Sequence, residues 1–137
     1  MEIILPSTFE RVEEHTSDKV NLKISEQTKR NINYYRGKSY NEIERRLKDL
    51  DAEWDTERVL EANASSLILV GTALGFAVNR KWHLLSGVVG GFLLQHALQG
   101  WCPPLSVIRR MGVRTATEIN EEKTALKEIR GDFGSGK

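Results

Sequence analysis

The sequence predicts an all-α protein: a two-span transmembrane helical hairpin flanked by amphipathic cytoplasmic helices. Three observations support this fold class. Residues 62–105 contain no Asp or Glu and only two cations, although 28% of the whole chain is charged. Two apolar stretches, 62–78 and 82–99, are separated by only three residues, so they must be antiparallel neighbours. Trp82 and Trp101 stand at the ends of the second stretch, as aromatic side chains do at membrane interfaces.

An N-terminal helical segment, residues 1–38, comes before these stretches. Its first residues do not resemble a signal peptide, because the apolar run is short, lacks a basic lead and continues into acidic residues. Asp18 can cap a helix, and Gly37 can end it in the left-handed conformation. The apolar side chains between them fall mostly on one helical face: Val20, Ile24, Ile32 and Tyr35.

Residues 39–61 are predicted to form an amphipathic juxtamembrane helix. Ser39 and Glu42 have the spacing of a capping box, which marks a helix start. Apolar residues then follow at alternating spacings of three and four, which places them in one narrow seam: Tyr40, Ile43, Leu47, Leu50 and Trp54. No Gly or Pro interrupts the sequence before residue 62, so the helix is expected to continue into the first apolar stretch.

Residues 62–101 are predicted to form the transmembrane hairpin. At ~1.5 Å per residue, its two stretches reach roughly 25–27 Å, slightly less than a hydrocarbon core of about 30 Å. A soluble hairpin would need a polar face on each helix, and residues 64–78 offer only small Ser and Thr side chains. Arg80 and Lys81 at the tip can extend to the interface and compensate for the short length.

The C-terminal segment, residues 102–137, is predicted to be a cytoplasmic helix and a tail. Pro103 and Pro104 should end the second span, since proline cannot continue a helix. Gly112 allows a turn, and Thr115 with Glu118 forms another capping box. The helix that follows is amphipathic and is expected to end at Gly131, with these residues on its apolar face: Ile119, Leu126 and Ile129.

The cation distribution predicts the orientation in the membrane. Seven Lys and Arg residues lie near the terminal side of the spans: Arg45, Arg46, Lys48, Arg58, Arg109, Arg110 and Arg114. The tip carries only two, and cytoplasmic flanks are the ones enriched in cations. Both termini are therefore expected in the cytoplasm, with the hairpin in a bacterial inner membrane.

Composition excludes several classes of function. A net charge of +1 and the lack of a basic run give no footprint for nucleic acid. One cysteine cannot form an internal disulfide or a multi-cysteine zinc site. The sequence also contains no phosphate loop, catalytic triad or metal-ligand spacing, so no enzyme activity, cofactor or metal is predicted.

Small residues within the two apolar stretches predict helix packing. Gly71 and Gly75 are four residues apart, as are Gly87 and Gly91, a spacing that lets helix backbones approach closely. One interpretation is that these faces close the hairpin on itself. The other is a homodimer interface, and both hold if the two faces differ.

Polar residues near the end of the second stretch form a second candidate set. Gln95, His96 and Gln99 would lie in hydrocarbon, so hydrogen bonds between helices are expected, with Asn63 and Ser66 as partners at the same depth. The functional alternatives are a proton relay, or a haem or metal site made by His96 from two copies of the chain.

Cys102 follows the second span directly. Its simplest interpretation is a packed thiol at the membrane interface. A sulfur carrier, a palmitoylation site or a haem thiolate would each require the thiolate, favoured by nearby Arg109 or Arg110.

Several segments resemble a bacterial family of uncharacterised proteins that carries the transmembrane domain of YgaP-like inner-membrane proteins. The resemblance covers roughly Arg45 to Phe133, and its most specific part is QGWCPPL followed by RRMGVRT. The family implies a helical hairpin in the inner membrane, joined in some members to a rhodanese domain. The chain before the hairpin is too short for a rhodanese domain, so no sulfurtransferase activity is expected.

Three hypotheses for function follow. The first is a non-enzymatic membrane anchor or assembly factor, whose protein partner is unknown. The second is an accessory in sulfur or redox transfer that uses Cys102. The third is a soluble helical binding domain with a buried hairpin.

Overall fold

The computed structural model describes residue 5 and residues 7–134. Residues 1–4, 6 and 135–137, which include parts of the predicted N-terminal segment and tail, lie outside the described residues. Helices and turns make up the described part of the chain, without a strand, which confirms the all-α prediction. The helices are α1 (Arg11–Glu14), α2 (Asp18–Tyr35), α3 (Tyr40–Ala52), α4 (Thr56–Ala77), the 3₁₀ turn η1 (Arg80–Trp82), α5 (His83–Gln99), α6 (Pro103–Arg110) and α7 (Ala116–Arg130).

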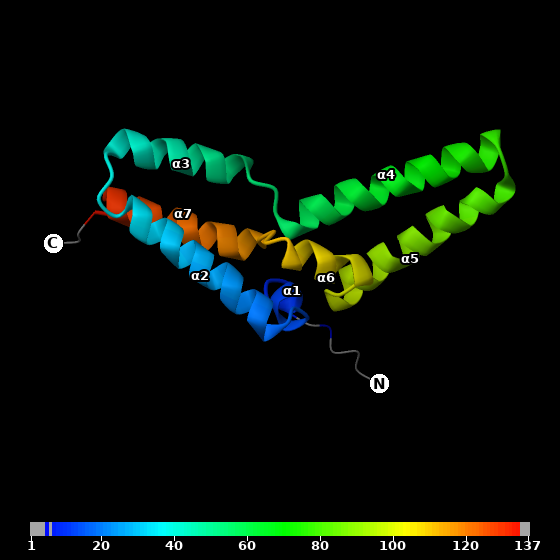
Figure 1. Cartoon of the computed structure of the whole chain (residues 1–137), viewed down its shortest axis with the longest axis horizontal. Coiled ribbons are helices and arrows are strands. Elements are labelled where there is room, and N and C mark those ends of the chain that lie inside the picture. Colours follow the sequence, from blue (N-terminus) through cyan, green and yellow to red (C-terminus); the bar gives the residue numbers. More distant parts are fainter. Residues whose placement is uncertain (1–4, 6, 135–137) are drawn as a thin grey trace.

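The helices form an elongated molecule with two ends (Figure 1). At one end, α4 and α5 run antiparallel, side by side, and project away from the other helices; we call them the apolar pair. At the other end lies the head, in which α7 packs against both α2 and α3. Between them, α1, α6 and the loops at 53–55, 100–102 and 111–115 form the junction.

Local capping signals set several helix ends. The predicted capping boxes are confirmed at Ser39, which starts α3, and at Thr115, which starts α7. Gly131 ends α7 in the left-handed conformation, as predicted. The predicted ends of α2 are wrong: its N-cap residue is Ser17, and Gly37 does not take a positive φ.

The expected continuous helix from residue 39 into the first apolar stretch is wrong. The chain leaves the helical conformation at Glu53, and α4 starts afresh with the Asp55 side chain accepting a hydrogen bond from the Arg58 backbone N–H at 2.8 Å. The Glu53 side chain reaches away to Arg114 in the 111–115 loop, 61 residues further along the chain. The break therefore coincides with a tertiary contact, and no residue near it in the sequence predicts a helix end.

The two prolines after α5 begin a helix where the sequence analysis expected only an exit from the membrane. Pro103 and Pro104 occupy the first positions of α6, where the missing N–H costs nothing and the fixed φ suits the helix. Cys102 before them is extended, at φ −154° and ψ 159°, as a residue preceding proline prefers.

Two small apolar clusters hold the head and the junction. In the head, the α3 seam packs on α7 through Ile43, Leu47, Leu50, Ile119 and Leu126. The outer seam residues Tyr40 and Trp54 are 60% and 49% exposed, so only the middle of the seam is packed. In the junction, α1, α4 and α6 meet through Val12, Leu60, Cys102, Leu105 and Ile108.

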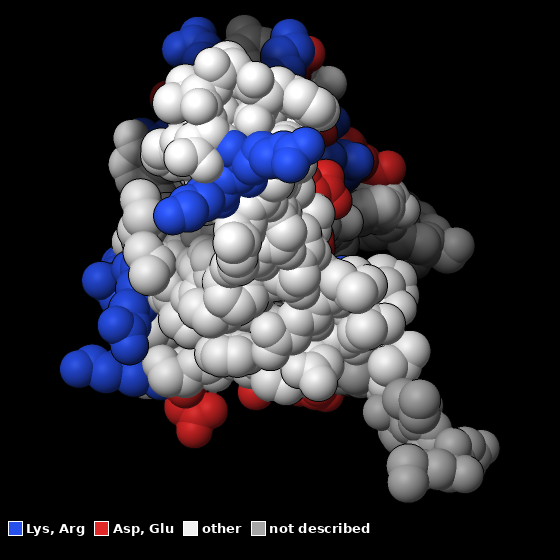
Figure 2. Space-filling model, turned by 90° about the vertical axis from the view of Figure 1, so that its right-hand side faces the viewer, with Lys and Arg blue, Asp and Glu red and all other residues white. Residues whose placement is uncertain are grey.

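The apolar pair leaves large apolar side chains uncovered. Figure 2 looks onto its far end, where the surface is almost wholly uncharged apart from Lys and Arg side chains lying across it. Exposed members along the pair include Leu69, Phe76, Val78, Leu84 and Leu94. Among the described residues, one segment, Tyr40–Ala77, which contains α3, the break and α4, is by length and composition a candidate to cross a membrane, and 22% of its most apolar window is buried.

Gly100 is a position where only glycine fits. It ends α5 with φ +77°, and its backbone N–H donates to the His96 carbonyl at 2.7 Å. A Cβ on Gly100 would lie 2.5 Å from the Arg11 Cβ, because α1 passes directly against this turn.

We therefore expect Gly100→Ala to destabilise the protein. The left-handed conformation alone costs about 1–2 kcal/mol for a residue with a Cβ, and displacement of α1 adds to this. Gly37→Ala is the control, since Gly37 has no positive φ and a Cβ there would meet no heavy atom within 4 Å. Unfolding midpoints in detergent check the comparison; equal midpoints for both variants would contradict it.

Candidate functional site

The junction concentrates the buried polar groups of the described chain. It is tied to α4 by the main chain, since the Thr56 N–H donates to the Arg114 carbonyl at 2.9 Å. Two buried arginines lie in it and one buried histidine, in α5, lies beside it, each bound to at least one carboxylate.

Arg109, at the end of α6, is 1% exposed and makes five hydrogen bonds. Its guanidinium donates hydrogen bonds to both carboxylate oxygens of Glu118 in α7, at 2.7 and 2.8 Å. Further bonds reach the Thr16 hydroxyl at 3.1 Å, the Asn21 amide oxygen at 2.9 Å and the Val113 carbonyl at 3.0 Å. One side chain thereby ties α6 to the start of α2 and the start of α7.

Arg114 connects the same junction to the head. It donates to both oxygens of Glu53, at 2.9 and 2.6 Å, and to Glu122 in α7. Glu122 is fully buried and also accepts from Arg46 of α3 at 2.8 Å and from Asn31 of α2 at 3.2 Å. Burial would raise the pKa of Glu122, but these hydrogen bonds outweigh it and hold the pKa below its ordinary value.

His96 lies at the root of the apolar pair. It is 2% exposed, and its Nε2 lies 2.9 Å from a carboxylate oxygen of Glu57 in α4. The other Glu57 oxygen accepts from Arg11 of α1 at 2.9 Å. The hydrogen bond with His96 is the main reason that the pKa of Glu57 lies below its ordinary value, and an ionised carboxylate accepts the proton on Nε2. The ring's other nitrogen, Nδ1, is buried without a hydrogen-bond partner among the described residues.

The predicted partners of the polar set are wrong. Asn63 and Ser66 donate to carbonyl oxygens of their own helix, at 2.8 Å to Val59 and 2.6 Å to Ala62. Gln95 is half-buried and Gln99 exposed, and neither side chain hydrogen-bonds to a described residue. Of this set, His96 alone joins two helices through its side chain, and its carboxylate partner lies outside the predicted span.

The glycines fall on two different surfaces. Gly71 and Gly75 are buried against α5: a Cβ on Gly71 would lie 2.7 Å from the Ser86 hydroxyl, and one on Gly75 would overlap the His83 ring. Gly87 and Gly91 have no heavy atom within 4 Å of a Cβ position, so they face away from α4.

Cys102 is fully buried in the junction cluster. Burial raises the pKa of its thiol, and the Glu57 carboxylate adds to the rise. Arg109, which was expected to favour the thiolate, directs its donors at Glu118, Thr16, Asn21 and Val113 instead. This environment is that of a packed thiol. No group of three or more His, Cys, Asp or Glu residues in the described chain is placed to hold a metal ion.

The sequence did not predict the carboxylates that pair with the buried arginines and histidine of this site. Glu53, Glu57 and Glu122 were not singled out, because their partners Arg114, His96 and Arg46 lie 61, 39 and 76 residues away in the sequence. For Glu118, the capping box with Thr115 was a signal for its place at a helix start, and gave no hint of Arg109.

Apolar helices that project from a polar junction are typical of helical membrane proteins. Residues 55–118 match the family described as inner membrane protein YgaP-like, transmembrane domain, which confirms the resemblance in the sequence; no rhodanese match accompanies it. The match begins at the N-cap residue of α4 and ends at Glu118, so it contains the Glu57–His96 and Arg109–Glu118 pairs. No curated protein and no solved structure matches the chain.

Removal of the Glu122 carboxylate should weaken the head strongly. Glu122→Gln leaves Arg114 and Arg46 without their shared anion, and breaking a buried pair costs about 3–5 kcal/mol. Glu128→Gln, on the exposed face of the same helix, is the matched control. Urea unfolding in detergent measures the difference, and equal losses for the two variants would contradict the role of the ion pairs.

The same carboxylate predicts a pH dependence. Because the pKa of Glu122 is lower in the folded protein, its stabilisation is complete above the ordinary carboxyl pKa of about 4.5 and is lost as the pH falls through the folded value. Unfolding midpoints measured from pH 7 downward should therefore drop below about pH 4.5. The drop should be smaller in Glu122→Gln than in the wild-type protein.

The two glycine surfaces predict different outcomes for the same substitution. Gly71→Ile should separate α4 from α5 and make the pair protease-sensitive in detergent, since Ser86 and the Trp82 carbonyl leave no space. Gly87→Ile should leave the pair intact and abolish only a dimer crosslink, if two copies meet there. Leu94→Ile is the control for both; protease resistance of Gly71→Ile equal to this control would contradict the close packing.

Proposed function

We propose that the protein is a non-enzymatic, two-span protein of the bacterial inner membrane that holds its helical head at the cytoplasmic face, as an anchor or assembly factor. The observation that carries this proposal is the apolar pair. Its outward side chains are apolar, and its ion pair, Glu57–His96, lies at the end next to the junction. Membership of residues 55–118 in an inner-membrane domain family supports it.

The second span follows from the first. By length and composition, the stretch containing α4 can cross a membrane, whereas α5 has only 17 residues. The antiparallel packing of α5 against α4 supports the insertion of both helices in the same bilayer. The shortfall of a few ångströms is small enough for local thinning of the bilayer or extension of the tip cations to the interface.

The proposed orientation rests on the cation count of seven against two. It places the head, with both termini, in the cytoplasm and the η1 tip on the opposite side. The open glycine face of α5, with Gly87 and Gly91, supports a homodimer formed within the membrane.

The absence of a catalytic role is also a proposal. It is supported by the buried ionisable groups, since Arg109, Arg114 and Glu122 are each held in ion pairs within the protein. Sulfur or redox transfer through Cys102 has no support from its surroundings, which bury the thiol and disfavour the thiolate. Persulfide labelling of Cys102 in cells would revive that alternative.

The topology can be tested with single cysteines in a Cys102→Ala background. We expect a cysteine at Asn79 to react with an impermeant thiol reagent in intact cells once the outer membrane is made permeable. A cysteine at Ser39 should react only after lysis, because the inner membrane shields it. The reverse pattern would overturn the orientation.

Fractionation tests the membrane assignment itself. The full chain should pellet with membranes and require detergent for release, since the apolar pair would otherwise face water. Recovery in the soluble fraction without detergent would instead favour the soluble binding domain.

A further inference from the structure

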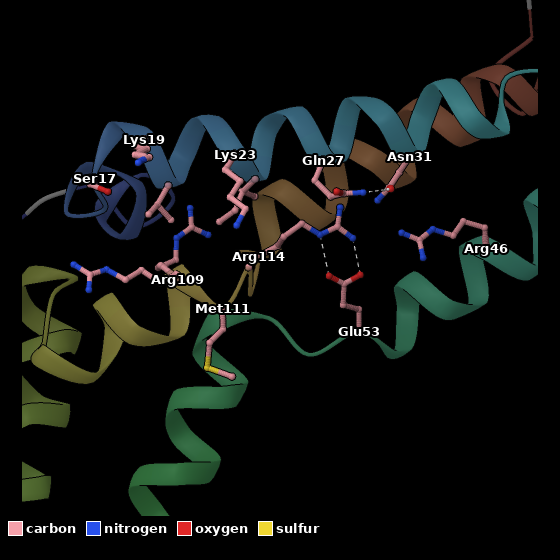
Figure 3. Close-up of a pocket in the computed structure, with 14 residues that line it drawn as sticks. Ser17, Lys19, Lys23, Gln27, Asn31, Arg46, Glu53, Arg109, Met111 and Arg114 are labelled. Carbon is pink, nitrogen blue, oxygen red and sulfur yellow. Dashed lines mark hydrogen bonds and ion pairs between the residues drawn. The ribbon is translucent and has the colours of Figure 1, made fainter.

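A large basic pocket lies between α2, α6 and the end of α3, next to the 111–115 loop of the junction (Figure 3). Its volume is about 700 Å³. One carboxylate, Glu53, lines it together with six cations: Lys19, Lys23, Arg46, Arg109, Arg110 and Arg114. The two lysines and the arginines of α6 are about ninety residues apart in the sequence, so folding alone brings these charges together.

Three of the six cations are already neutralised. Arg46, Arg109 and Arg114 bind the carboxylates of Glu122, Glu118 and Glu53, as described above. Lys19, Lys23 and Arg110 are exposed and make no ion pair with any residue that the structure describes. The pocket therefore keeps three uncompensated positive charges at its rim, which favours an anionic ligand such as a phosphate group.

A second hollow lies against α6, which also lines the basic pocket. This apolar groove, of about 300 Å³, is formed by α4, α5 and α6, and Pro104, Val107 and Ile108 line it from α6. Met111 follows them at helical spacing, is 78% exposed and lines the basic pocket. A strip of apolar surface thus leads from the groove to the pocket.

We propose that these two hollows together bind one anionic phospholipid of the cytoplasmic leaflet. The phosphate of the headgroup lies among Lys19, Lys23 and Arg110, and an acyl chain follows the strip into the apolar groove. This proposal rests on the proposed membrane insertion and orientation, which place the junction at headgroup depth. A soluble phosphate ester shares the headgroup chemistry, but it has no acyl chain to occupy the apolar groove.

The test compares lipid binding by native mass spectrometry of the full chain extracted in detergent. Phosphatidylglycerol should bind more tightly than phosphatidylcholine with the same acyl chains. The triple variant K19Q/K23Q/R110Q should lose this preference, by roughly fivefold in affinity for each cation removed. The matched control K29Q/R36Q/K48Q removes three exposed cations outside the pocket and should keep it.

Further arms separate the sources of the phosphate. The variant V107Q/M111Q should weaken phosphatidylglycerol binding, since it makes the strip polar, while leaving the binding of inorganic phosphate unchanged. Inorganic phosphate that binds as tightly as the lipid would overturn the lipid assignment in favour of a soluble ester. Equal losses in the two triple variants would show nonspecific charge attraction and overturn the pocket.

Failure of this inference can be distinguished from failure of the proposed function. Each variant is first fractionated, and a chain that is released from membranes without detergent would overturn the membrane assignment together with this inference. A chain that inserts but shows no preference for phosphatidylglycerol overturns the lipid site alone.

Discussion

The rest of the structure depends on the burial of two guanidinium groups at one place. Arg109 and Arg114 are 1% and 6% exposed, and a buried cation without a counter-charge would cost several kcal/mol. The break after α3, the turn before α2 and the start of α7 all bring polar groups to these two side chains: Glu53, Thr16 and Glu118. Since the apolar clusters of head and junction are small, the ion pairs decide how these helices are oriented.

The features that the sequence predicted well are those with local causes. Apolar length and the short polar tip located α4 and α5 to within a residue at three of their four ends, and the capping boxes located the starts of α3 and α7. The exception is the start of α4 at Thr56, where Asp55 caps a helix that seemed uninterrupted in the sequence. Burial of the middle of the α3 seam was predictable, because its spacing is that of one helical face.

The features that could not be predicted depend on contacts between distant residues. Glu53 and Arg114 are 61 residues apart, and His96 and Glu57 are 39 apart. A charged residue in a polar stretch looks solvent-exposed whether or not a partner arrives from elsewhere. The basic pocket is the extreme case, since its lysines come from α2 and its arginines from α3, α6 and the following loop. An evenly balanced net charge concealed this concentration of cations.

The positions of Glu118 and Glu122 after the two arginines in the chain have a consequence for biosynthesis. The ribosome releases α4, α5 and both arginines before it has made the two carboxylates that neutralise them. Until α7 emerges, the guanidinium groups lack these carboxylates, and α2 and α3 lack the helix on which they pack. Closure of the junction therefore waits for the synthesis of α7, and a chain that stops short of α7 keeps an open, cationic junction.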